Sequence, residues 1–380
     1  MAQTREMVTL RARGKEFGNW TGLSLSRSID SFPSAFSVSM SAGQPGTINP
    51  LGIATGDPVE VYLGRELLLT GYAEEVTESR GKSGRLRSVS GRSRAVDAMC
   101  SCTGEPSEFL GGYLDSIATA LAAPYGLSVA SDVVSLEPLA RWAPEPGETV
   151  IGALERLCHD AGAFVTDDAA GNLILAVKGM TAAAAIDAAA CPEMSVKCSS
   201  ADRYSEYRVY GQRRGDDAVF AADAATPVAI VQDSAIERYR MLVVMADQQA
   251  DIAACERRGV WEAVTRAGRS AVATLTVPGW RDGDGVLYAP NVLRRVEDSD
   301  LGVWAELLVT EVTLRLDSGG TVAEMTLMPP GAFELQPPEE RKKPITHGWR
   351  PWWNRAMTTL DKAVPNKGKK AAAPHEDWFD

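Results

Sequence analysis

The chain has 380 residues, of which 45% are hydrophobic, and a formal net charge of −11. This length predicts two or three domains, and the composition is that of a folded protein, which excludes an intrinsically disordered chain. The negative charge argues against a general nucleic-acid binder, because neutralising phosphates requires an excess of Lys and Arg.

Short alternating runs, separated by turn residues, fill the chain from Met7 to about Cys102. An apolar residue at every second position is typical of strands with one buried face. The predicted strands are Val8–Ala12, Leu23–Ile29, Phe36–Met40, a hairpin of Val59–Leu63 with Leu67–Tyr72, and Arg85–Gly91. Residues 1–104 are therefore expected to form an antiparallel β module of barrel or sandwich size.

The apolar period changes to that of helices between Ser107 and Lys178. Helical spacing and then strand alternation predict helices from Leu110 to Leu121 and from Val150 to Cys158, the latter ended by Gly162, and a hairpin of Ala163–Thr166 with Leu173–Val177. Residues 105–180 should therefore form a small α/β domain. We interpret it as a packing spacer, because no chemical motif is concentrated there.

Residues 181–335 are expected to form a second β module with one inserted helix. The segment Thr181–Ala190 is rich in alanine and is interpreted as a connecting loop or a short helix. The other predicted elements are strands at 204–210, 228–232 and 241–244, a helix at about 250–266, and strands at 274–277, 292–296, 305–316 and 321–327. Gly-Asp, Pro-Asn and Gly-Gly turns separate the last four strands, as in antiparallel strands that close on themselves.

The two β modules share a short sequence likeness. Glu66–Thr70, followed by a turn and Arg85–Val89, parallels Glu306–Thr310, followed by Asp317–Gly320 and Val322–Leu327. Five similar residues are weak evidence by themselves, so duplication and chance both stay open at this point.

The composition shifts to Pro, Lys and Trp after Leu335. Residues 336–380 are net basic while the rest of the chain is net acidic, and they hold four of the nine tryptophans: Trp349, Trp352, Trp353 and Trp378. A basic, Pro-broken segment with aromatic anchors folds poorly alone and docks well into a groove. These tryptophans are the candidate partner-docking residues. The alternatives are packing on the chain's own body and stacking on nucleic acid.

Motifs for catalysis are missing from the sequence. It contains no GxxxxGK phosphate loop, no GxSxG elbow and no HExxH zinc helix. The three histidines are His159, His347 and His375. His159 follows Cys158 on a predicted helix, where adjacent side chains point in different directions, so a Cys-His dyad is not expected. We predict no catalytic residue and no cofactor.

The stretch Asp282–Gly285 resembles the start of a calcium loop. Positions five and twelve of that loop are Val286 and Leu293, which offer no side-chain ligand, so the sequence predicts a hairpin turn and no metal site. Three acid pairs are interpreted as solvated carboxylates at turns or strand ends: Glu74-Glu75, Asp167-Asp168 and Asp216-Asp217. A glycosidase pair stays open, because its two carboxylates can be distant in the chain.

The six cysteines form no CxxC pair and have no histidine at zinc-finger offsets, so we interpret them as reduced thiols that are mostly small core residues. Residues Met1–Val8 lack the apolar region of a signal peptide, and no apolar run approaches the roughly 18 residues of a membrane span. We expect a chain made in the cytoplasm without a membrane anchor.

Four short segments are similar to one protein family: Val277-Pro278-Gly279-Trp280, Pro290-Asn291, Leu307–Thr310 and Pro329-Pro330. They resemble the baseplate hub proteins of contractile phage tails, of the Mu-like and late-control-D type, whose bacterial relatives form the hub of VgrG spikes. The resemblance implies an α+β, mainly β fold with two similar antiparallel β-barrel modules and an intervening small α/β domain.

The resemblance also implies a function. Three subunits with two equivalent barrels each give a pseudo-sixfold ring, which can adapt a sixfold tail tube to a threefold central spike and leave a duct for DNA ejection. The implied partners are two further copies of the chain, the tail tube protein, the central spike protein and other baseplate proteins, with DNA passing through unbound. The implied location is the virion tail baseplate, after assembly in the host cytoplasm.

Two alternatives remain. One is a cell-wall hydrolase of the tail tip. The other is the hub of a bacterial type VI-like secretion spike, which should continue into a β-helical needle that this sequence does not contain.

Overall fold

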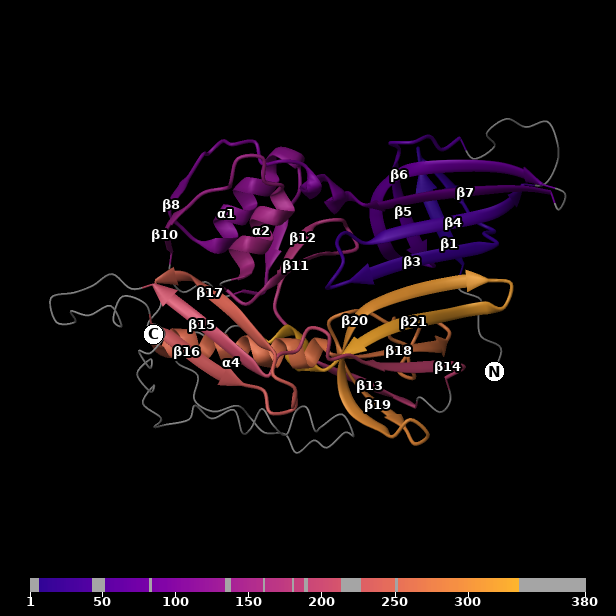
Figure 1. Cartoon of the computed structure of the whole chain (residues 1–380). Coiled ribbons are helices and arrows are strands. Elements are labelled where there is room, and N and C mark those ends of the chain that lie inside the picture. The colour runs from indigo at the N-terminus through magenta and orange to yellow at the C-terminus, as the bar shows by residue number, and fades with distance from the viewer. Residues whose placement is uncertain are drawn as a thin grey trace, which may run out of the picture. The chain divides into compact units, whose positions relative to one another are not determined.

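The computed structural model describes residues 7–42, 52–81, 84–133, 138–159, 161–179, 181–187, 191–212, 227–249 and 252–334 (Figure 1). These residues are mainly β-strand, as predicted. They divide into two compact units. The first unit extends to Lys197 and resumes at Ala271, and the second consists of Cys198–Ser270.

The N-terminal strands of the first unit confirm the alternating pattern. They are β1 (Val8–Ala12), β2 (Lys15–Phe17), β3 (Gly22–Ser28), β4 (Ala35–Ala42), β5 (Pro58–Leu63), β6 (Glu66–Gly81) and β7 (Gly84–Ser93). Their order in the sheet is β3-β4-β7-β6-β5-β1-β2, and every pair is antiparallel. Inward-pointing side chains such as Leu25, Val38 and Val89 are completely or almost completely buried.

A second set of strands lies in the same unit. Its members are β13 (Ala182–Asp187), β14 (Glu193–Cys198), β18 (Ala271–Pro278), β19 (Leu293–Asp298), β20 (Val303–Asp317) and β21 (Gly320–Met328). Their order is β14-β18-β21-β20-β19-β13. The four strands predicted between residues 274 and 327 are confirmed.

Two predictions for this second set are wrong. Residues 182–187 form strand β13, where the sequence predicted a loop or a short helix. Strand β13 also runs parallel to β19, so the set is not purely antiparallel. Alanine has little strand preference of its own, and here the hydrogen bonds to β19 decide its conformation.

Five strands of each set share one strand order, although the next strand is antiparallel in the first set (β1) and parallel in the second (β13). Taken in chain order, β3, β4, β5, β6 and β7 have the same neighbours as β14, β18, β19, β20 and β21. Both long hairpins also carry a bulge at the same place: the extra residue is Glu74 in β6 and Thr310 in β20. Both hairpins have the same number of residue pairs between the bulge and the turn. The pairs run from Glu75–Ser90 to Gly81–Gly84 in the first hairpin and from Glu311–Thr326 to Asp317–Gly320 in the second.

The short sequence likeness does not follow this equivalence. Glu66 is the first residue of β6 and pairs with Leu63 beside the turn, whereas Glu306 lies inside β20 and pairs with Arg295. The bulge aligns Thr310 with Glu74 and not with Thr70. The likeness between Glu66–Thr70 and Glu306–Thr310 is therefore out of register, and the repeat is visible in the topology alone.

The two sets are joined through the second half of β20, beyond the residues that pair with β19. Strand β20 pairs with β3 from Glu311–Ser28 to Leu316–Leu23, which makes one sheet of 13 strands. Among the described residues, no strand pairing connects the two ends of this sheet.

A small α/β domain lies between the two sets in the chain. Its elements are η1 (Arg94–Met99), β8 (Phe109–Gly112), α1 (Leu114–Ala122), η2 (Ala123–Tyr125), β9 (Val129–Ser131), β10 (Leu139–Trp142), α2 (Val150–His159), β11 (Phe164–Asp167) and β12 (Leu173–Ala176). Both helices pack on one apolar core with Leu173 and Leu175. The prediction that Leu110 belongs to the first helix is wrong: it lies on β8 and is 69% exposed, because Gly111 (φ +66°) interrupts the helical period.

The second unit contains β15 (Glu206–Gln212), β16 (Val228–Gln232), β17 (Met241–Gln249) and α4 (Ile252–Arg269). The sequence predicted these strands, but as part of a β module with one inserted helix. Instead the three strands form a separate sheet, in the order β16-β15-β17, and α4 packs on it. This unit interrupts the second set between β14 and β18, which corresponds to the connection between β3 and β4 in the first set.

Gly259 allows α4 to approach its sheet closely. A Cβ atom at this position would lie 2.7 Å from Cγ2 of Val231 and 3.4 Å from Cγ2 of Val209. We expect Gly259→Leu to destabilise the second unit by about 1–3 kcal/mol, because the helix must move away from the sheet. Denaturant unfolding followed by hydrogen exchange in β15 would measure the loss. Unchanged protection of Tyr207 and Val209 would contradict the prediction.

Candidate assembly surfaces

The side of the joined sheet opposite its core is lined by hydroxyl groups. We call it the hydroxyl face and define it by Ser24, Ser26, Ser37, Ser39, Ser88, Ser90, Thr274, Thr276, Thr313 and Thr326. Strand register places these residues in rows that cross both sets of strands. One row runs from Arg315 on β20 through Ser24, Ser37 and Ser90 to Glu75 on β6. A second row joins Thr276, Glu324, Thr313 and Ser26.

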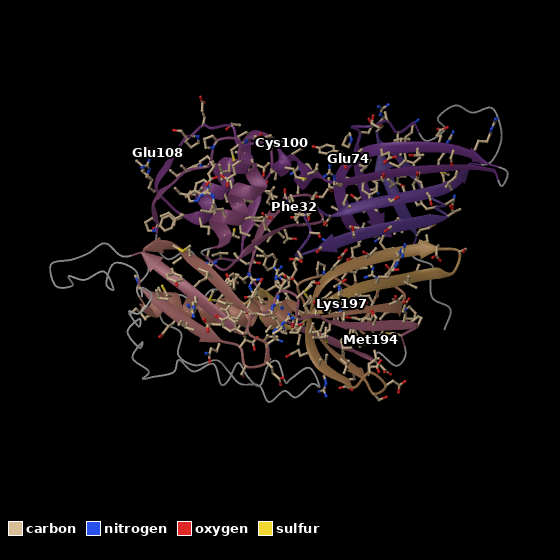
Figure 2. The ribbon with its side chains drawn as sticks, viewed as in Figure 1. Phe32, Glu74, Cys100, Glu108, Met194 and Lys197 are labelled. Carbon is tan, nitrogen blue, oxygen red and sulfur yellow. The ribbon has the colours of Figure 1, made fainter. Side chains whose placement is uncertain are left out.

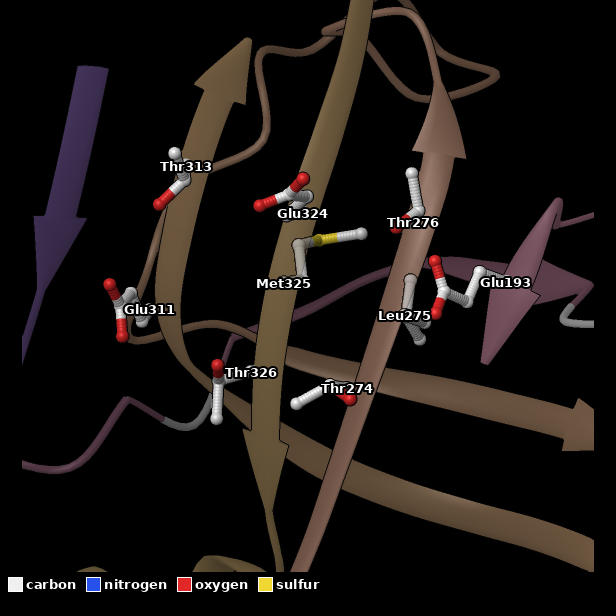
Figure 3. A pocket seen from close by; sticks show the side chains of 9 residues that line it. All are labelled: Glu193, Thr274, Leu275, Thr276, Glu311, Thr313, Glu324, Met325 and Thr326. Atoms are coloured by element: carbon white, nitrogen blue, oxygen red, sulfur yellow. The ribbon is translucent and has the colours of Figure 1, made fainter. Parts of the chain in front are cut away.

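The hydroxyl face is hollowed where β14, β18, β21 and β20 lie side by side (Figure 3). The hollow has a volume of about 280 Å³ and is lined by Glu193, Thr274, Leu275, Thr276, Glu311, Thr313, Glu324, Met325 and Thr326. Leu275 and Met325 are only 2% exposed. The surface that a neighbouring molecule would meet therefore consists of hydroxyl and carboxylate groups.

Two arginines of this face are paired with carboxylates. Arg315 donates to Glu324 over 2.5 Å, and this hydrogen bond raises the pKa of the arginine. At the other end of the rows, Arg92 binds both carboxylate oxygens of Glu74 at 2.7 Å (Figure 2 labels Glu74). An arginine that is paired with a carboxylate attracts phosphate groups less strongly than a free arginine. Further carboxylates such as Glu311 repel phosphate groups.

A buried ion pair closes the turn after Trp280. Asp282 and Arg294 are 2.9 Å apart, and their side chains are 4% and 2% exposed. Arg294 also donates to the carbonyl oxygen of Ala184 at 2.9 Å and lies over the ring of Tyr288. Burial acts to raise the pKa of Asp282, but hydrogen bonds from the Val286 backbone and from Arg294 outweigh it and hold this pKa below its usual value.

The predicted hairpin turn at Asp282–Gly285 is confirmed. The backbone NH of Asp282 donates to the carbonyl oxygen of Val286, and Arg281 and Leu287 form an antiparallel bridge. In the ranges that the structure describes, no three His, Cys, Asp or Glu residues are grouped to hold a metal ion. The Asp282 carboxylate forms an ion pair with Arg294 instead.

The candidate docking residues Trp349, Trp352, Trp353 and Trp378 lie outside the described residues, as do His347 and His375. His159 is the last residue of α2. Its neighbour Cys158 is buried, and desolvation raises the pKa of that thiol to about 12. A thiol with this pKa is protonated at neutral pH and is a poor nucleophile.

The acid pairs are less simple than predicted. Glu74 is a bulge residue inside β6 and not at a strand end. Asp167 ends β11 but is buried, and it accepts hydrogen bonds from the backbone NH and the hydroxyl of Ser34, at 3.2 and 2.9 Å. Asp216 and Asp217 lie outside the described residues. A solvated carboxylate is therefore the wrong interpretation for Asp167, whereas Glu74 is 37% exposed and only its predicted place at a turn or strand end is wrong.

All six cysteines are free thiols. Cys158 and Cys255 are buried, Cys102 and Cys191 are partly buried, and Cys100 and Cys198 are exposed. The interpretation of the cysteines as mostly core residues is correct for two of them only.

Comparisons with known proteins agree with this fold. Three family models match: "Mu phage baseplate assembly protein GpP-like, N-terminal" over residues 7–93, "Baseplate hub protein gp44-like, second domain" over 96–177, and "Mu phage baseplate assembly protein GpP, fourth domain" over 251–336. Baseplate hub protein gp44 of Escherichia phage Mu is 30% identical over 350 residues, which cover 88% of this chain and 91% of that protein. The chain belongs to the Mu-like baseplate hub protein family.

Solved structures extend this family likeness to the fold. The 43 kDa tail protein of prophage MuSo2 from Shewanella oneidensis has a TM-score of 0.77 at 29% identity, covering 87% of this chain and 100% of that one. The tail protein from Neisseria meningitidis MC58 has a TM-score of 0.74 at 21% identity, covering 87% and 98%, and shows the fold alone.

Family membership fixes the general role. The chain is a structural baseplate hub protein of the phage tail, and the hydrolase interpretation has no support from its relatives. Its location is the tail baseplate of the virion. None of the described helices is long and apolar enough to span a membrane.

The hydroxyl face was not predicted from the sequence. The signal for it was present, because serine takes the alternate positions in Leu23–Ser28, in Phe36–Ser41 and in Arg87–Ser90. The serines on one strand can be recognised from that alternation. Their alignment across β3, β4 and β7 depends on the pairing of these strands, and the continuation of the face onto the second set depends on the β20–β3 pairing. The sequence reveals neither.

Proposed function

We propose that the chain acts as a homotrimeric adapter, in which the two sets of strands are two β-barrel modules of one design. Three copies would present six modules, matching a sixfold tail tube on one side and a threefold central spike on the other. Tail tube protein, central spike protein and other baseplate proteins would be the partners, and assembly would take place in the host cytoplasm.

A single observation carries this proposal: five strands of each set have the same order and the same bulge position, and the two sets are hydrogen-bonded to each other through β20 and β3. A ring that mimics sixfold symmetry needs equivalent neighbouring modules within each chain. The matching topology supports that equivalence.

The hydroxyl face is the surface best suited to line a duct for DNA. Its side chains are short, its arginines are paired, and its carboxylates repel phosphate groups. Tight binding of DNA requires unpaired Lys and Arg, so DNA would slide past this face without being held.

We also propose domain boundaries. They are a first β module over 1–104 and a small α/β domain over 105–180; the family matches, which end at residue 93 and restart at 96, support two such domains with a boundary nearer residue 95. The second β module would comprise 181–197 and 271–335, with 198–270 as an inserted domain, and residues 336–380 would form a docking tail.

The adapter role predicts a trimer in solution. Three chains of 40.7 kDa have a mass of about 122 kDa, which light scattering of the purified protein would measure. A mass that stays near that of one chain at micromolar concentration would rule out the ring.

The duct role has a separate readout in the same preparation. Replacing Ser24 and Ser37 by lysine should leave the mass unchanged and make the ring retain short duplex DNA in a gel-shift assay. A matched variant with lysine at Ser31 and Ser234, which are exposed and outside the hydroxyl face, should retain less DNA. Equal retention by both variants would contradict the assignment of this face to the duct.

A further inference from the structure

The sheet of the second unit has one apolar side that is exposed. Its side chains are Val228 and Ile230 on β16, with 39% and 51% exposure, and Met241, Val243 and Met245 on β17, with 41%, 48% and 55% exposure. We call these five residues the β16–β17 apolar face. The alternate residues of the same strands point to the other side, where Ala229 and Val231 are buried under α4.

Strand register places these residues on one side of the sheet, on the two strands that flank β15. Ile230 and Val243 both pair with Arg208 of this central strand, and Val228 and Met245 both pair with Tyr210. Arg208 forms an ion pair with Glu206 on the same strand, so the charges between the two apolar rows compensate each other. Five exposed apolar side chains on one side of a three-stranded sheet are more than the scattered apolar residues of an ordinary surface, and they indicate a docking site.

The chain itself contains a segment that suits this surface. Residues 336–380 follow the described part and lie almost entirely beyond the family models, the last of which ends at residue 336. Trp349, Trp352 and Trp353 are clustered within this segment. A tryptophan buries about 150–250 Å² on an apolar surface, and methionine sulfur makes favourable contacts with aromatic rings.

Attachment to the same chain favours this occupant over a free partner. Attachment through a short segment raises the effective concentration of a docking group to the order of millimolar. The stretch from Glu334 to Trp352 can span up to about 60 Å when extended.

We propose that the β16–β17 apolar face is the docking site for the tryptophan cluster of residues 336–380 of the same chain. This contact is independent of the adapter role, because neither the ring nor the duct requires it. In this proposal, the basic, Trp-rich tail binds to the sheet of the second unit.

Photo-crosslinking in the full-length chain tests the contact directly. A benzoyl-phenylalanine placed at Val243 should crosslink within one chain to tryptic peptides from residues 344–355. The matched control places the same group at Val286, which is 57% exposed on the Asp282 turn, and should give no such crosslink. Equal tail crosslinks from both positions, or none from Val243, would overturn the proposal. Crosslinks from Val243 to a second copy would overturn the same-chain assignment.

A dye-binding experiment gives an independent readout. Replacing Trp349, Trp352 and Trp353 by alanine in the full chain should uncover the face and raise the fluorescence of an apolar-surface dye severalfold. Adding Ile230→Asp should cancel that rise, because the uncovered surface becomes charged. A triple alanine variant with unchanged dye binding would overturn the proposal.

Discussion

Replacing Asp282 with alanine is expected to lower the free energy of unfolding of the first unit by about 3–5 kcal/mol, because Arg294 is left as a buried charge without its carboxylate. The remaining partners of Arg294, the Ala184 carbonyl and the Tyr288 ring, carry no compensating negative charge. Denaturant unfolding of the purified variant measures the loss.

A surface pair supplies the control for this variant. Glu324 and Arg315 form an ion pair at 2.5 Å, but their side chains are 42% and 51% exposed. Glu324→Ala should therefore cost less than about 1 kcal/mol, since water screens the charge that remains. Equal losses from Asp282→Ala and Glu324→Ala would contradict the role that we assign to burial.

The same ion pair has a pH signature. The pKa of Asp282 is lower in the folded than in the unfolded chain, so its contribution is fully present above the unfolded pKa of about 3.9. That contribution is lost as the pH falls through the folded value. Acid should therefore narrow the stability gap between the wild type and Asp282→Ala.

Gly91→Val is expected to destabilise the first set of strands by more than about 3 kcal/mol, because β6 and β7 cannot separate locally to make room. A Cβ atom at Gly91 would lie 1.8 Å from the carbonyl oxygen of Tyr72. The contact is reciprocal, since a Cβ at Gly71 would lie 1.9 Å from the carbonyl oxygen of Arg92. Relief requires a shift of the backbone beside the Glu74 bulge. Thermal unfolding and soluble yield report the effect.

Gly18→Ala is the matched control for Gly91→Val. The nearest atom to a Cβ at Gly18 is the carbonyl oxygen of Val8 at 3.8 Å, which is an ordinary contact. This change should alter the melting temperature little. A Gly91→Val chain that unfolds at the temperature of Gly18→Ala would show that the two strands are not held as described.

The turn at Asp282–Gly285 could be predicted from the sequence, but the ion pair that Asp282 forms could not. The turn at Asp282–Gly285 and the absence of calcium ligands at Val286 and Leu293 were readable from local spacing, and the turn is present. The ion pair between Asp282 and Arg294 could not be predicted from the sequence, because the burial of both side chains depends on the pairing of strands β13 and β19. Asp167 was misjudged for the same reason: its partner Ser34 is distant in the chain.

The repeat shows the limits of sequence comparison within one chain. Glu66–Thr70 and Glu306–Thr310 look alike, yet they occupy different positions of their hairpins. The real equivalence, between the bulges at Glu74 and Thr310, joins two residues with different side chains. Bulge position and strand order constrain the backbone, whereas the two side chains have different surroundings: Glu74 is 37% exposed and Thr310 is 1% exposed.

The sequence by itself determined the strands with one buried face, the helices Leu114–Ala122 and Val150–His159 within narrow limits, and membership of a structural phage-tail family. Each of these depends on local periodicity or on short motifs. The tertiary structure alone decided that Ala182–Asp187 is a strand, that residues 198–270 are a separate unit, and that the serines of β3, β4 and β7 align into one face. These features depend on hydrogen bonds between strands far apart in the chain, and side-chain periodicity carries no information about which strands pair.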